Sequence, residues 1–128
     1  MTKCRLILVR PMRVFLLVSL FAASASAAQL HVQAKDIVGD WVSLRGCSRS
    51  LYKFSSNGEY RGYCFDTIES GRWSLDAGNK ILITYYDAKN TISVKSRQSA
   101  MTITGFEPHS DRTFMYVRSH GGEDKWMK

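Results

Sequence analysis

Short runs of aromatic and β-branched residues, separated by clusters of turn-forming residues, recur along most of this chain. Runs of this length, repeated about every 10–12 residues, are typical of strands in an antiparallel sheet. The connections between them are too short for the crossover helices that parallel strands need. The predicted strands are residues 41–44, 51–55, 59–65, 70–75, 80–86, 91–96, 100–106 and 113–118.

Turn residues between these runs support hairpins. Asn57-Gly58 separates two of the runs, and this pair supplies the positive φ angles that tight hairpins require. The clusters 76–79, 87–90 and 107–112 separate others. Eight strands in sequence order predict an all-β fold, a small antiparallel up-and-down β-barrel, because closing the sheet removes its exposed edges. An open β-sandwich is the alternative.

The N-terminus predicts export. Residues 1–13 carry four basic residues and no acid, an apolar run covers 14–23, and Ala25-Ser26-Ala27 supplies small residues for cleavage. This order is typical of a secretory signal peptide, and the apolar run is too short to span a membrane. We therefore expect a signal peptide over 1–27, starting at Met1 or Met12, and a periplasmic or secreted protein without a stable membrane anchor.

The net charge falls once this segment is removed. It contains four of the 18 basic residues and none of the 11 acidic ones, so the charge drops from +7 to +3. A small positive charge with interspersed acids does not predict nucleic-acid binding. The remaining chain has the size of one domain, expected over 28–118 as a monomer, followed by a glycine-rich, charged and flexible tail over 119–128.

Two cysteines remain after the signal. Cys47 and Cys64 predict one disulfide, as is common in small exported domains. Its loop of about 16 residues would restrict the unfolded chain by about 3 kcal/mol. A redox or metal pair is the alternative, but the sequence has no C-x-x-C spacing.

The stretch "IVGDW" (37–41), with the hairpins "YKFSSNGEY" and "SGRWSLDAGNKILITYY" and the strand "TFMYVR", resembles small exported bacterial lipocalin-like domains of the calycin type with their G-x-W motif. The resemblance implies a lipocalin-like β-barrel over 28–118. It also implies that Gly39 allows a close turn, that Trp41 closes the barrel floor, and that Arg118 stacks on its ring. The chain is shorter than a full lipocalin, so large side chains are expected to fill much of the interior.

Catalytic and metal-binding patterns are weak. His31, His109 and His120 fall in predicted loops or the tail, and no Ser/His/Asp or Cys/His set has supporting context. We expect no enzyme, no metal and no cofactor.

The aromatic residues suggest binding instead. Tyrosine offers rigid apolar area with a polar tip, which suits a ligand or a protein surface. The candidate contacts are Tyr60, Tyr63, Tyr85, Tyr86 and Phe114.

Two function hypotheses follow. The first is a non-catalytic exported binding protein that takes a small apolar ligand or a protein partner. The second is a periplasmic inhibitor or immunity factor that contacts another protein through loops near 45–50, 66–70 and 107–112. A cavity lined by Tyr85, Ile83 and Phe114 would favour the carrier, and a packed interior would favour the inhibitor.

Overall fold

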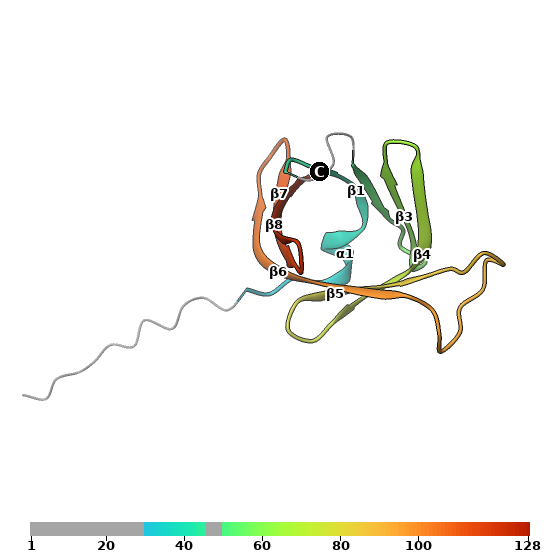
Figure 1. Ribbon diagram of the computed structural model, residues 1–128. Helices are drawn as coiled ribbons and strands as arrows, with labels where there is room; N and C mark the ends of the chain where they lie inside the picture. The colour runs from blue at the N-terminus through green and yellow to red at the C-terminus, as the bar shows by residue number, and fades with distance from the viewer. Residues whose placement is uncertain (1–29, 46–49) are drawn as a thin grey trace, which may run out of the picture.

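The fold is a closed barrel of eight antiparallel strands, seen in a computed structural model that describes residues 30–45 and 50–128 (Figure 1). Every strand pairs with its neighbours in sequence, and the pairing of Val42 with Met127 joins the last strand to the first. The predicted all-β up-and-down barrel is thus confirmed, and the sandwich alternative was wrong. The elements are α1 (Ala34–Ile37), β1 (Gly39–Ser43), β2 (Leu51–Phe54), β3 (Glu59–Cys64), β4 (Thr67–Asp76), β5 (Lys80–Tyr85), β6 (Gln98–Pro108), β7 (Thr113–Ser119) and β8 (Gly122–Met127).

Alternation along each strand builds the core. Side chains at every second position point inward, where Trp41 and Ile81 are fully buried and Phe54 is almost so. Edge-on packing of Phe54 against Trp73, with ring centroids 5.3 Å apart, is favourable for aromatic pairs. The buried apolar core comprises Val32, Ile37, Trp41, Phe54, Tyr60, Trp73, Ile81, Ile83, Ile103, Met115, Val117 and Trp126.

One end of the barrel is closed by α1, which lies within the ring of strands (Figure 1). Ile37 is fully buried there, and Asn79 at the β4–β5 turn donates a hydrogen bond to the Leu30 carbonyl at 3.0 Å. Because the chain enters β1 from this end, the β1–β2, β3–β4, β5–β6 and β7–β8 connections lie at the opposite end, which we call the open end.

The expected flexible tail at 119–128 was wrong, because most of it is β8. Gly122, with a φ of +101°, lies at the turn from β7, and Trp126 is almost completely buried. The Trp126 indole N–H donates to the Asp124 carboxylate at 2.9 Å, so an acid of this segment supports the buried ring. The glycines mark a hairpin turn, and the single tryptophan anchors the final strand.

The strand expected at 91–96 was also wrong, since these residues belong to the β5–β6 connection. Asp87 accepts hydrogen bonds from the backbone N–H groups of Lys89 and Thr91, each at 2.9 Å, which fixes a turn in place of a strand. Val94 is fully exposed, so the alternation of Ile92 and Val94 reflects no buried face. Figure 1 shows this connection extending away from the barrel.

Candidate functional site

Trp41 is fully buried, as the floor position implied by the lipocalin resemblance requires. Its indole N–H donates to the Ile37 carbonyl at 2.7 Å, which ties the ring to α1. Gly39 precedes it with a φ of +133°, a conformation that favours glycine. A side chain at Gly39 would also meet Cδ of Lys128 at 2.7 Å, so the lysine stem passes directly over this position.

The cation over Trp41 is Lys128 instead of Arg118. The Lys128 ammonium lies 4.7 Å from the Trp41 ring and donates to the carbonyls of Asp36 and Val38 at 2.9 and 3.0 Å. Burial lowers the pKa of this ammonium, while the nearby Asp36 charge opposes that effect. The end of the chain therefore closes the barrel floor.

The predicted role of Arg118 was wrong because of strand alternation. Met115 and Val117 point into the barrel from β7, so Arg118 faces solvent. Its guanidinium pairs with Glu123 on β8 at 2.7 Å. An exposed pair of this kind contributes little to stability.

Among the predicted contact residues, Tyr60 and Tyr85 meet inside the barrel near the open end. Their rings pack edge-on with centroids 6.1 Å apart. The Tyr85 hydroxyl shares a 2.8 Å hydrogen bond with the Ser99 hydroxyl. Arg97 lies over the Tyr85 ring at 3.9 Å and pairs with Glu69 at 2.8 Å. The mouth cluster consists of Tyr52, Tyr60, Glu69, Tyr85 and Arg97.

Burial controls protonation in the mouth cluster. Desolvation raises the pKa of Tyr60 far above its ordinary value, and the neighbouring tyrosines and Glu69 act in the same direction. Desolvation also raises the pKa of Tyr85. The hydrogen bond to Glu69 raises the pKa of Arg97. The two phenols are therefore neutral across the physiological range, beside a formed ion pair.

A hollow of about 220 Å³ opens beside this cluster. Its volume is below the range of roughly 300–1,000 Å³ that drug-sized ligands occupy. The deeper interior is filled, as shown by Ile83, which is almost completely buried. The hollow is lined by Tyr52, Gly62, Tyr63, Cys64, Thr67 and Glu69.

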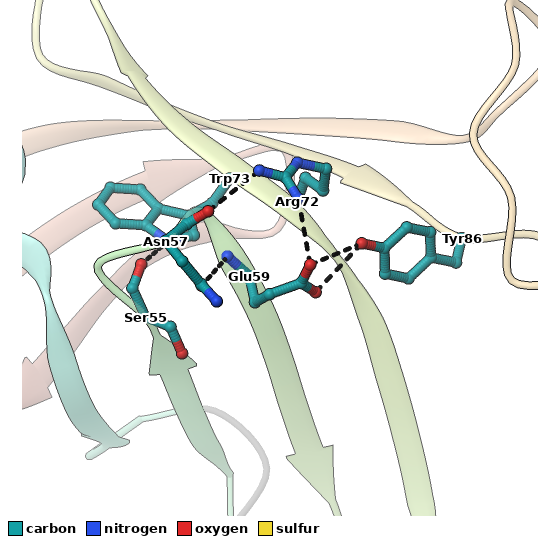
Figure 2. Close-up of polar contacts among 6 residues, drawn as sticks. All are labelled: Ser55, Asn57, Glu59, Arg72, Trp73 and Tyr86. Atoms are coloured by element: carbon teal, nitrogen blue, oxygen red, sulfur yellow. Dashed lines mark hydrogen bonds and ion pairs between the residues drawn. The ribbon is translucent and has the colours of Figure 1, made fainter.

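Tyr86 lies outside this cluster, and its hydroxyl has a structural partner (Figure 2). The hydroxyl contacts both carboxylate oxygens of Glu59, at 3.0 and 3.1 Å. Arg72 donates to the same carboxylate at 3.1 Å and to the Asn57 carbonyl at 3.0 Å. Trp73 donates to the Ser55 carbonyl at 2.9 Å. These contacts fix the β2–β3 turn against β4.

Tyr63 and Phe114 face the outside of the barrel, so Phe114 does not line a cavity with Tyr85 and Ile83, the arrangement that would have favoured a ligand carrier. Both residues instead belong to a continuous line of apolar side chains that runs across six strands, from β7 through β8, β1, β2 and β3 to β4. Each member is the direct cross-strand partner of the next. The outer apolar row consists of Phe114, Met127, Val42, Leu51, Tyr63 and Ile68.

A larger hollow, of about 590 Å³, lies over β4, β5 and β6, next to the β7–β8 turn. Small and polar side chains such as Ser74, Thr84 and Gln98 line much of it, together with Leu82 and His120. It contains no Asp, Glu, Lys or Arg among the lining residues that the structure describes. The mouth cluster is thus the more distinctive chemical environment.

The predicted disulfide stays a prediction. Cys64 ends β3 at the open end, beside the hollow, whereas Cys47 lies outside the described residues.

Neither a metal centre nor a membrane-spanning helix is found in the described part of the chain. Across 30–45 and 50–128, no group of three or more His, Cys, Asp or Glu residues is placed to hold a metal ion. Within the same ranges, no helix is long and apolar enough to cross a bilayer. His109 packs edge-on against Phe114 at 5.8 Å, and its Nε2 lies 3.9 Å from Glu107.

Comparisons with protein-family models, curated proteins and solved structures find no match to this chain. The barrel agrees with the fold that the lipocalin resemblance implies, and membership of that family stays a prediction.

Sequence reasoning missed several residues of these surfaces. Glu69 and Arg97 are 28 positions apart and are brought together only by the register of β4 beside the β5–β6 connection. Val42 and Met127 are 85 positions apart in the numbering and become neighbours only when the barrel closes. Because successive side chains of a strand point to opposite faces, the sequence could have predicted that Val42 faces outward when Trp41 faces inward.

Proposed function

We propose that this protein is a non-catalytic binding protein that contacts an extracytoplasmic protein partner through the outer apolar row. The observation that carries the proposal is the unbroken cross-strand pairing of six apolar side chains on the outside of the barrel. The outer face of a solvated antiparallel sheet normally carries polar residues. An outer line of six apolar side chains, two of them exposed, is therefore a candidate interaction site.

The exposed members of the row are Val42 and Ile68, whereas Phe114, Met127, Leu51 and Tyr63 are partly buried. Val42 is 40% exposed and Ile68 is 62% exposed. Phe65, in the β3–β4 turn beside Ile68, is 68% exposed and has a φ of +53°. That conformation is unfavourable for a bulky residue, so the turn holds an aromatic ring in solvent at a conformational cost. Exposed aromatic residues are frequent energetic anchors of protein interfaces.

The row connects the segments near which loop contacts were expected. Leu51 directly follows the 45–50 segment, Ile68 lies within 66–70, and Phe114 lies two residues after 107–112. These segments do not gather at one end, because the β6–β7 connection lies at the α1 end and the other two at the open end. The surface suited to a partner is therefore the wall of the barrel between them.

The filled interior favours a protein partner over a large apolar ligand. Trp41, Phe54 and Ile83 occupy the space in which such a ligand would lie. Within the described residues, closure of the barrel pairs each of the eight strands on both sides, which disfavours a partner that binds by adding a strand. A partner must then be recognised by side chains, and the outer apolar row supplies such side chains.

Charge-introducing variants test this proposal. We would use the tagged protein to capture partners from the envelope and external fractions of its own host, comparing wild type with the double variant Val42→Lys, Ile68→Lys. Val94→Lys is the matched control, because Val94 is apolar and fully exposed but lies outside the row. We expect one stoichiometric partner that the control retains and the double variant loses by at least about tenfold.

Equal capture by both variants would contradict the proposal. Native mass spectrometry of the purified protein would reveal whether it forms a dimer with itself. A dimer that the double variant abolishes would show that the row binds a second copy of this chain instead of a different protein.

A further inference from the structure

Tyr60 has a buried ring and an unpartnered hydroxyl. The residue is 2% exposed, and its hydroxyl has no hydrogen-bond partner among the described residues. In the same part of the chain, no fully enclosed side-chain oxygen or nitrogen lacks a partner. The Tyr60 hydroxyl must therefore reach solvent, although its ring does not.

Gly62 shows where this hydroxyl points. A side chain added at Gly62 would collide with the Tyr60 hydroxyl and lie 3.6 Å from the Tyr52 ring. Gly62 also lines the hollow of about 220 Å³. The hydroxyl thus lies against Gly62, next to the residues that line the hollow, over a position that only glycine leaves open.

Both donors and acceptors surround the hollow. The Tyr60 hydroxyl, next to Gly62, can donate or accept, and Thr67 in the lining contributes another hydroxyl. Glu69 directs one carboxylate oxygen to Arg97, and its second oxygen has no hydrogen-bond partner among the residues described. The Tyr52 ring, packed on Trp126 with centroids 4.6 Å apart, supplies an apolar wall.

We propose that this hollow binds a single polyhydroxylated ring, such as one sugar unit. The hydroxyl groups of such a ring donate to the second oxygen of Glu69 and accept from the Tyr60 hydroxyl, while its C–H groups pack against Tyr52. This site is independent of the outer apolar row, and either can fail without the other.

Other ligand classes fit the hollow less well. An apolar ligand would remove water from the Tyr60 hydroxyl and from Glu69 without replacing their hydrogen bonds, which is unfavourable. An anion would be repelled by Glu69, which lines the wall. The volume admits one ring but is too small for a long chain or a drug-sized molecule.

The test is an NMR titration of the ¹⁵N-labelled, purified protein. D-glucose and N-acetyl-D-glucosamine would be added separately up to about 50 mM, because single small ligands bind with millimolar affinity. We expect at least one sugar to shift the amide signals of Gly62, Thr67 and Glu69. Hexanoate, as an apolar anionic probe, should leave these signals unchanged.

Tyr60→Phe removes the hydroxyl and keeps the ring. We expect it to weaken sugar binding about five- to tenfold, the loss of one hydrogen bond. Tyr86→Phe is the matched control, since the same atom is removed on the outside of the barrel, and it should bind like wild type.

Glu69→Gln provides a second variant, and we expect weaker binding because the acceptor loses its charge. The proposal is overturned if neither sugar shifts the three signals, if Tyr60→Phe binds like wild type, or if hexanoate shifts the same signals at lower concentration.

Discussion

The buried phenol of Tyr60 predicts a specific loss of stability in alkali. Its pKa in the fold lies well above 10.0, its ordinary value, with desolvation as the main cause. Above pH 10 the unfolded chain therefore loses a proton that the folded protein keeps. The stabilisation is fully present below pH 10 and is lost as the pH rises above it.

The magnitude follows from this linkage. Each pH unit above 10 lowers the free energy of unfolding by about 1.4 kcal/mol for one retained proton, so about 2 kcal/mol is lost by pH 11.5. Tyr85, whose pKa is also raised, acts in the same direction. Tyr60→Phe should therefore make the fall of the free energy of unfolding above pH 10 less steep, by about 1.4 kcal/mol per pH unit. Because the hydroxyl has no partner, the variant should differ from wild type by less than about 1 kcal/mol at pH 8.

Urea unfolding followed by tryptophan fluorescence, at pH 8, 9, 10, 11 and 11.5, provides the measurement. At each pH we would subtract the free energy of unfolding of Tyr60→Phe from that of wild type, because the titration of all other groups cancels in this difference. Equal slopes for wild type and Tyr60→Phe would refute the claim that this phenol is desolvated in the fold.

Three further predictions concern the barrel floor and the cysteines. Trp41→Ala should lower the free energy of unfolding by about 3–5 kcal/mol in urea denaturation, and a change below about 1 kcal/mol would contradict its role as the floor. Lys128→Met should lower the free energy of unfolding by about 1–2 kcal/mol, since two hydrogen bonds and the contact with Trp41 are lost. Arg118→Met should change it by less than about 0.5 kcal/mol. A larger effect at Arg118 than at Lys128 would show that Arg118 is the cation that supports Trp41. Thiol labelling of the unreduced, unfolded protein should detect no free sulfhydryl at Cys47 or Cys64, and labelling of both would disprove the disulfide.

The barrel could be predicted because local signals agree with the global fold in most strands. Asn57-Gly58 marks a turn at which Asn57 accepts a 3.0 Å hydrogen bond from the Glu59 N–H, and this contact needs no distant partner. Such hairpins define their own register. When the hairpins are joined in sequence order, only the first and last strands still lack a neighbour, and pairing them closes the barrel.

Prediction failed where a distant partner decides the structure. Trp126 converts a glycine-rich, charged segment into β8, because its burial depends on rings from β2, such as Tyr52. The reverse holds for Ile92 and Val94, whose strand-like alternation lies in the β5–β6 connection, where both side chains are exposed. The side of the barrel on which each aromatic residue lies depends on parity along its strand, which places Phe114 outside and Tyr60 inside.

Photo-crosslinking in the native host tests the central claim most directly. A photoreactive amino acid would replace Ile68 in the outer apolar row or, in a second variant, Val94 outside it. The account predicts a crosslinked adduct with one defined protein at Ile68 and none at Val94. No adduct at Ile68, or the same adducts at both positions, would contradict the proposal that the outer apolar row binds a protein partner.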